Sequence, residues 1–264
     1  MIPNMVSRRP IATRPWLAGI VLWLALMSAS LQAYAQVAGT VTQLSGAMMA
    51  KKADGKVRIL SLKSEVDSGD TLITEKNTYA LVKFIDNSEI TLKPATTFVV
   101  EQFAYQADQP DGDRASFNLV KGGLRSLSGL LGKRSKEKFS LKTPVATIGI
   151  RGTYFTAEYI GAGGYTPPVS SSSTGAPSGP TLAPGLYTSV ITGQIVLNNR
   201  AGTLDIAAGQ FGFTSNINTP PVLVPQSAGL QFTLPVKLGS NVAGTTGGSS
   251  ASPAKSAGPE CVVQ

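Results

Sequence analysis

Alternating hydrophobic and polar positions recur in short segments through the middle of the chain. This two-residue period is typical of half-buried β-strands. The segments that show it are Val57–Leu60, Tyr79–Ile85, Glu89–Leu92, Thr97–Val100, Ala115–Val120, Lys138–Leu141 and Thr153–Ala157. The tight Asp86-Asn87-Ser88 sequence joins two of these segments and predicts a hairpin.

Turn residues separate the predicted strands at Ser68-Gly69-Asp70, Lys121-Gly122-Gly123 and Thr143-Pro144. The one stretch with helical character, Leu124–Leu131, contains a glycine and is followed by another, so it predicts a single short turn at best. Many short strands separated by turns predict an all-β domain. It is either a short-stranded sandwich or a small solenoid-like β-domain.

Residues 1–35 have the three parts of a secretory signal. Arg8 and Arg9 give a positive start, an apolar run spans Trp16–Met27, and small side chains precede the expected cleavage between Ala35 and Gln36. A membrane anchor is the alternative, but spanning needs about 20 apolar residues and this run is shorter. We therefore expect an exported protein, periplasmic or secreted.

The rest of the chain divides by composition. We expect a β-domain over residues 36–214, with a flexible inserted loop at 161–185 that is rich in Gly, Ser and Pro. Residues 215–238 predict a Pro-rich link and a segment that could add an edge strand. Residues 239–264 predict a disordered tail, which contains the single cysteine, Cys261.

Composition argues against catalysis. The 264 residues include no histidine and one cysteine, which excludes Ser-His-Asp and Cys-His pairs, His-based zinc sites and thiolate clusters. The acidic cluster at Asp108–Asp113 lacks the downstream glutamate of a calcium loop and is interpreted as a solvated hairpin loop. We therefore expect no enzymatic activity, no cofactor and no metal.

Positive charge is concentrated in one part of the chain. Of the formal net charge of +8, much comes from residues 121–151, which hold eight basic residues and one acidic residue. The densest part predicts an interaction patch of Lys133, Arg134, Lys136 and Lys138. Such a strip could attract a polyanion or an acidic partner. Alternatively, its lysines keep a solvated hairpin from aggregating.

Several motifs occur in a recognisable order. They are Val66–Thr74, with a Gly-Asp turn; Phe139–Ala146, with Thr-Pro; Ile150–Phe155, with Arg-Gly-Thr; and the closing pair Val190–Gly193 and Ala208–Gln210. Through them the chain resembles the FecR domain family over about residues 37–214. The resemblance implies an all-β periplasmic module, best known in regulators that pass a siderophore signal from an outer-membrane receptor to a sigma factor.

The residues of this chain that match the family signature are Gly69, Asp70, Thr143, Pro144, Arg151, Gly152, Thr153 and Phe155. Most are interpreted as structural. The glycines allow positive φ, Asp70 bonds turn amides, and Pro144 fixes the start of a strand. Arg151 could cap carbonyls and hold two β-layers together, which we favour, or grip an anionic group of a partner.

The chain also departs from the family's regulators. Those proteins place a cytoplasmic sigma-binding segment and a membrane helix before the periplasmic domain, whereas a cleavable signal is expected here, so we do not expect direct sigma-factor control. The predicted function is an exported, non-catalytic module for protein–protein interaction or signalling in the cell envelope. The alternative is binding of an anionic envelope polymer (lipopolysaccharide, peptidoglycan or polysaccharide) through residues 121–151. No nucleic-acid partner is expected.

Overall fold

The computed structural model describes residues 36–162 and 182–226. The expected signal (1–35), most of the expected inserted loop (161–185), the segment 230–238 that could add a strand, and the tail with Cys261 lie outside the described residues. No helix in the two described ranges is long and apolar enough to cross a membrane.

Short β-strands make up most of the regular structure, which confirms the all-β prediction. They are β1 (Val37–Leu44), β2 (Met48–Lys51), β3 (Val57–Leu60), β4 (Glu65–Asp67), β5 (Thr71–Thr74), β6 (Ala80–Phe84), β7 (Glu89–Leu92), β8 (Thr97–Ala104), β9 (Arg114–Leu127), β10 (Phe139–Lys142), β11 (Thr147–Ile150), β12 (Tyr154–Ile160), β13 (Gly185–Thr192), β14 (Gln194–Asn199), β15 (Gly202–Ala207), β16 (Phe211–Thr214) and β17 (Val222–Val224). The helical elements are η1 (Pro110–Gly112), α2 (Leu130–Arg134) and η2 (Lys136–Lys138).

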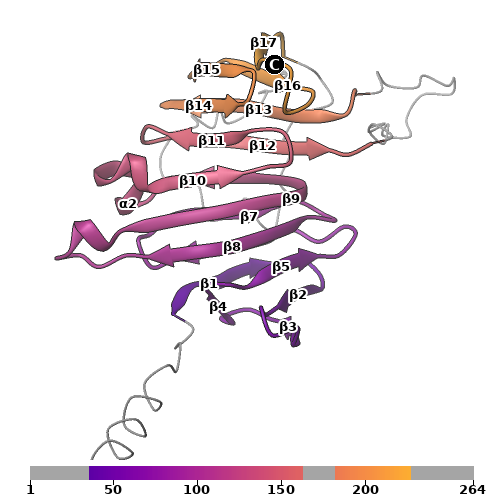
Figure 1. The fold of residues 1–264 in the computed structure, drawn as a ribbon. Coiled ribbons are helices and arrows are strands. Elements are labelled where there is room, and N and C mark those ends of the chain that lie inside the picture. Colours follow the sequence, from indigo (N-terminus) through magenta and orange to yellow (C-terminus); the bar gives the residue numbers. More distant parts are fainter. Residues whose placement is uncertain (1–35, 163–181, 227–264) are drawn as a thin grey trace, which may run out of the picture. The chain divides into compact units, whose positions relative to one another are not determined.

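The strands pair into two sheets. Sheet A runs β4-β1-β6-β7-β9-β12-β13-β16-β17. Sheet B runs β3-β2-β5-β8-β9-β10-β11-β14-β15. The β9–β10 pair is parallel and the others are antiparallel. Both sheets grow largely in chain order, from β3 and β4 towards β15 and β17 (Figure 1). The fold thus has the two layers of a sandwich and the sequential growth of a solenoid.

Strand β9 belongs to both sheets. Its first half pairs with β8 and β10 in sheet B, and its last residues pair with β7 and β12 in sheet A. Gly122, at the crossing, has φ +86°, and a Cβ there would lie 2.7 Å from the Cα of Thr96. The turn predicted at Lys121-Gly122-Gly123 was therefore wrong. The glycines bend one continuous strand instead of separating two.

The predicted short turn of helix at Leu124–Leu131 was also misplaced. Leu124–Leu127 is the end of β9, held between β7 and β12, and the helix begins only at Leu130. Gly129 lies between the two elements, where a Cβ would be 2.3 Å from the backbone nitrogen of Ser88. Pairing on both sides therefore overrides the local helical tendency of this leucine-rich segment.

A cluster of phenylalanines fills the space between the sheets. Phe84 comes from β6 in sheet A, whereas Phe98, Phe103 and Phe117 come from β8 and β9 in sheet B. The ring centroid of Phe84 lies 4.8 Å from that of Phe103 and 5.3 Å from that of Phe117. All four side chains are buried. The apolar positions of the alternating pattern therefore face one shared core.

Regular structure continues beyond residue 214, where we expected the domain to end. Strand β17, which lies in the expected Pro-rich link, pairs with β16 and is the outermost strand of sheet A among the described residues. Pro220, Pro221 and Pro225 flank it. Prolines are common at sheet edges because they cannot donate to a further strand.

The bend at Gly122 can be tested by adding a single methyl group. We expect Gly122→Ala to lower the free energy of unfolding by at least about 2 kcal/mol, because of the positive φ and the contact with Thr96. Gly112→Ala is the matched control, since a Cβ there would meet nothing within 4 Å. Equilibrium urea unfolding measures both. Equal stability of the two variants would contradict a required bend.

Candidate functional site

The first part of the signature forms a buried ionic cluster. The Asp70 carboxylate is buried and accepts hydrogen bonds from Arg58 Nη2 at 2.7 Å, Lys52 Nζ at 3.3 Å and the Asp67 N–H at 3.0 Å. The hydrogen bond to Asp67 raises the pKa of Lys52. Gly69, with φ +91°, closes the turn. Asp70 therefore holds the β2–β3 hairpin against the turn before β5, which is a structural role.

Two further signature positions also serve the fold. The Thr143 hydroxyl donates to the Ala146 carbonyl at 2.7 Å and accepts from the Ala146 N–H at 3.1 Å, which closes the turn between β10 and β11. Pro144 lies exposed in this turn. Phe155 is fully buried in the core. The side chains of Thr143 and Phe155 are therefore used by the fold, whereas Pro144 is exposed.

The Arg-Gly-Thr turn before β12 is held from two sides. Thr153 Oγ1 donates to the Gln194 carbonyl at 2.6 Å, and the Arg151 N–H donates to the same carbonyl at 2.9 Å. Ser128 Oγ donates to the Thr153 carbonyl at 2.9 Å and accepts from the Thr153 N–H at 3.0 Å. Gly152 has φ +65° between them. The turn therefore has a fixed geometry relative to β14 and the end of β9.

Among residues 36–162 and 182–226, no contact supports the structural role that we favoured for the side chain of Arg151. Residue 151 is exposed, and its guanidinium makes no hydrogen bond or ion pair within the described parts of the chain. The reason is local, because the turn carries Arg151 out of the strand that ends at Ile150. Arg151 is thus a cation on a fixed turn, with no side-chain partner in the described part of the chain.

A depression lies beside this turn, where strands β9 and β13 of sheet A end. It has a volume of about 350 Å³ and is lined by Asn87, Leu127, Ser128, Gly129, Leu130, Lys133, Gly152, Thr153 and Thr192. Leu127 and Leu130 are 43% and 45% exposed. It therefore combines apolar side chains with the cationic group of Lys133. Arg151 directly precedes the lining residue Gly152 in the chain but is not itself a lining residue. We call it the signature depression.

A buried carboxylate fixes one wall of the signature depression. Asp86 Oδ2 accepts from the Leu131 N–H at 3.1 Å, and the Asp86 carbonyl accepts from the Leu130 N–H at 2.8 Å. Its Oδ1 accepts from Ser88 Oγ at 2.6 Å. These bonds join the β6–β7 turn to the start of α2. Leu130 is therefore held in its exposed position by the backbone.

One of the four residues of the predicted basic patch, Arg134, forms hydrogen bonds within the chain. Arg134 Nε and Nη2 bond the two Asp113 oxygens at 2.8 and 2.7 Å, and its guanidinium lies 4.5 Å from the Tyr105 ring centre. Arg134 also donates to the carbonyls of Gln106 and Ala107. It is therefore a tie between α2 and the loop after β8 and is not free for a partner. Lys133 and Lys136 are exposed, and Lys138 is half-buried.

Asp113 corrects another expectation, since it was read as part of a solvated loop. Its side chain is fully buried and also accepts from Ser135 Oγ at 2.8 Å. The hydrogen bond from Arg134 holds the pKa of Asp113 below its usual range, against the opposing effect of burial. Asp108 and Asp111, in contrast, are exposed as predicted.

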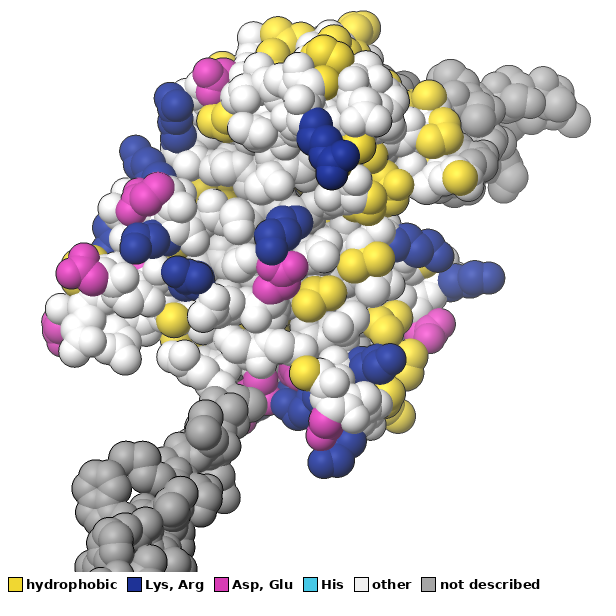
Figure 2. All heavy atoms as spheres, in the orientation of Figure 1, with side chains coloured by type: hydrophobic (Ala, Val, Ile, Leu, Met, Phe, Trp, Pro, Cys, Tyr) yellow, Lys and Arg dark blue, Asp and Glu magenta, His cyan; other side chains and the backbone are white. Residues whose placement is uncertain are grey.

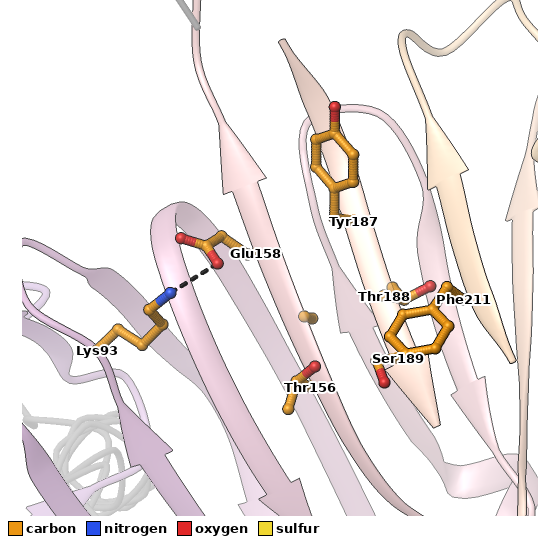
Figure 3. Close-up of a pocket in the computed structure, with 8 residues that line it drawn as sticks. Lys93, Thr156, Glu158, Tyr187, Thr188, Ser189 and Phe211 are labelled. Atoms are coloured by element: carbon orange, nitrogen blue, oxygen red, sulfur yellow. Dashed lines mark hydrogen bonds and ion pairs between the residues drawn. The ribbon is translucent and has the colours of Figure 1, made fainter. Parts of the chain in front are cut away.

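A second hollow lies on the outer face of sheet A. Figure 3 shows Lys93 and Glu158 pointing towards each other, at 2.7 Å, near Tyr187 and Phe211. Its volume of about 10 Å³ has room for one water molecule at most. It is therefore too small for an organic ligand. No group of three or more potential metal-ligating side chains occurs among residues 36–162 and 182–226.

Sequence reasoning found the Arg-Gly-Thr turn but missed the rest of the signature depression. Leu127 and Leu130 fell within the stretch assigned to a helical turn, and Asn87 was seen only as a hairpin residue. No local signal could have placed Leu127 at the surface. Continuing the alternation of β9 beyond Val120 would have put it on the buried side, with Phe117 and Leu119, and the bend at Gly122 reverses this phase.

Comparison with known families agrees with this description. Residues 70–166 match the family model described as FecR protein. The chain therefore contains a FecR domain. The matched range includes the Arg-Gly-Thr turn and all residues that line the signature depression except Thr192. Members of this family are known as regulators and not as enzymes, so the match favours a regulatory role for this chain.

Individual protein sequences and solved structures give no further support for a function. No curated protein sequence matches the chain. Two solved structures of a candidate anti-sigma factor from Parabacteroides distasonis align with TM-scores of 0.40 and 0.41, at 11% and 13% identity. Each alignment covers 60% of this chain and 60% of that protein. These values are too low for any conclusion about function.

The signature residues should separate into two groups when substituted. We expect Asp70→Asn to lower the free energy of unfolding by about 1.5–3 kcal/mol, because buried hydrogen bonds to a charged group are lost. Arg151→Gln should change it by no more than about 0.5 kcal/mol, because its side chain is exposed. Urea unfolding measures both. A large loss of stability in Arg151→Gln would contradict the exposed position of its guanidinium.

The Asp113–Arg134 pair should make stability depend on pH. A carboxyl whose pKa is depressed in the folded state stabilises it above the unfolded pKa of about 4, and this contribution is lost as the pH falls through the folded pKa. The wild type should therefore lose more stability than Asp113→Asn between about pH 5 and pH 2. Exposed Asp111→Asn is the control and should follow the wild type. Parallel curves for wild type and Asp113→Asn would disprove the effect.

Proposed function

We propose that this chain is an exported, non-catalytic binding module that mediates protein–protein interaction in cell-envelope signalling, with the signature depression as its contact surface. The FecR domain supports the signalling class. One observation carries the choice of surface. Arg151 is an exposed cation without a partner in the described chain, yet its backbone is bonded to Gln194.

The chemistry of the signature depression indicates what it would bind. Leu127 and Leu130 offer an apolar floor, Lys133 lines it with a positive charge, and the exposed Arg151 directly precedes the lining residue Gly152 in the chain. A planar guanidinium recognises a carboxylate through two parallel hydrogen bonds. Binding energy at interfaces concentrates where such a group adjoins buried apolar contacts. The partner that fits is a protein segment with an acidic residue next to an apolar one.

The anionic-polymer alternative has less support. Arg134 is bonded to Asp113 at 2.7 Å, and Lys142 to Glu101 at 2.7 Å. On the face drawn in Figure 2, basic side chains are spread among acidic ones and form no continuous patch. Polymer binding by counterion attraction needs a field of one sign, which is weakened here. It is retained as an outcome of the test.

The test is affinity capture from envelope extracts with matched charge variants. The site variant combines Lys133→Gln with Arg151→Gln. The control combines Lys121→Gln with Lys136→Gln, which removes the same charge from exposed positions that do not line the signature depression. We expect wild type and control to retain the same protein, and the site variant to bind it at least about tenfold more weakly.

Treating the extract with protease and raising the salt concentration separate the two candidates. Capture that disappears after protease treatment supports a protein partner. Ligand that survives protease, is released by salt and is lost equally in both charge variants would overturn the proposal in favour of a polymer. Equal capture of the protein by wild type and site variant would place the contact elsewhere.

A further inference from the structure

Strand β3 is an open edge of sheet B with apolar side chains on its outer face. Among the described residues it pairs with β2 alone. Val57 is 59% exposed and Ile59 is 81% exposed, while Arg58 and Leu60 turn inwards. Exposed apolar edge strands are sites where another strand can add, and proteins usually protect them.

The hydrogen-bond pattern shows which backbone groups of β3 are available. The Lys52 N–H donates to the Lys56 carbonyl at 2.8 Å, so this opposed pair is a hydrogen-bonded one. Hydrogen-bonded and non-hydrogen-bonded pairs alternate in antiparallel sheets. Arg58 therefore bonds to β2, whereas the N–H and C=O groups of Val57 and Ile59 point to the free edge. The same two residues thus present apolar side chains and unpaired backbone groups.

The apolar surface continues inwards from the edge. Ile59 lies opposite Met49 on β2, and Met49 lies opposite Ile73 on β5. Both inner residues are half-buried. Figure 2 shows hydrophobic side chains gathered over this part of the molecule, near β2, β3 and β5. A strand added beside β3 would extend the apolar surface formed by Ile59, Met49 and Ile73 and would cover part of it.

We propose that two copies of the chain associate through β3, antiparallel and centred on Arg58. In this register Val57 of each copy lies opposite Ile59 of the other. Each of these pairs exchanges both backbone hydrogen bonds, because all four residues point their free groups to the edge. The same pairs place valine against isoleucine on the outer face, a favourable cross-strand combination. A two-fold contact of this kind closes on itself, so the product is a dimer and not a fibre.

Charge favours a second copy over an acidic peptide as the occupant. Arg58 is 2.7 Å from Asp70, Lys52 contacts both Asp67 and Asp70, and Lys56 is 3.0 Å from Asp54. Three of the four basic residues of the hairpin, Lys52, Lys56 and Arg58, are therefore ion-paired within one chain, and only Lys51 makes no ion pair among the described residues. Two copies meet without strong repulsion, and an acidic strand gains little attraction. Because β3 is a short strand, the dimer is weak and depends on concentration.

This inference does not rest on the proposed function. The β3 edge shares no residue with the signature depression. A variant at Ile59 therefore leaves the capture experiment at that depression unaffected.

Sedimentation velocity over a wide concentration range tests the association. The sample is protein purified from cells that express the full chain, in the processed form that they make. We expect a monomer–dimer equilibrium whose Kd rises at least about tenfold in Ile59→Lys. The matched control is Val120→Lys, at a 43% exposed valine separated from β3 by β2, β5 and β8. It should dimerise like the wild type.

Hydrogen exchange adds a readout that does not depend on the substitution. In the wild type, the amides of Val57 and Ile59 should become protected as the concentration rises, while the already bonded Arg58 amide should change little. Circular dichroism checks that Ile59→Lys keeps its fold. A protein that is monomeric at all concentrations, a dimer unchanged by Ile59→Lys, or a dimer without protection at Val57 and Ile59 would each overturn the proposed pairing.

Discussion

The bend of β9 at Gly122 is the constraint on which the rest of the structure depends. One strand supplies a central member of both sheets, so the two layers cannot move independently of each other. It also brings Phe117 to the core and Leu127 to the surface within one continuous segment. The end of this strand leads directly through Gly129 into α2. The position of the signature depression is therefore set by the geometry of the core.

Buried carboxylates hold the loops that this framework leaves unsupported. Asp70 ties the β2–β3 hairpin, Asp86 ties the start of α2, and Asp113 ties α2 to the loop after β8. Each carboxylate is matched by several donors, which offsets the cost of burying its charge. Arg151 stands apart from this arrangement, because its backbone is fixed and its charge has no partner among the residues that the structure describes. A cation held in place in this way is suited to recognition.

The two proposed surfaces differ in how charge is used. At the signature depression, Lys133 and Arg151, which precedes the lining residue Gly152, remain to select an acidic partner. At the β3 edge Lys52, Lys56 and Arg58 are ion-paired internally, and hydrogen bonds and apolar contacts dominate. Because the surfaces share no residues, the chain could bind a partner and a second copy at the same time. Dimerisation would then present two depressions, which strengthens binding to a partner with two matching segments.

The sequence by itself determined the kind of structure and the positions of seven of the seventeen described strands, in whole or in part. The two-residue alternation located β3, β6, β7 and parts of β8, β9, β10 and β12, and the ordered motifs identified the FecR domain. Only the tertiary structure decided that Gly122 bends a strand, that Arg134 binds Asp113, and that Arg151 finds no side-chain partner within residues 36–162 and 182–226. The reason is physical. Alternation reflects which face of a local strand is buried, whereas the bond partner of a charged side chain is set by segments far away in the chain. Asp113 and Arg134 are 21 positions apart, and no local pattern connects them.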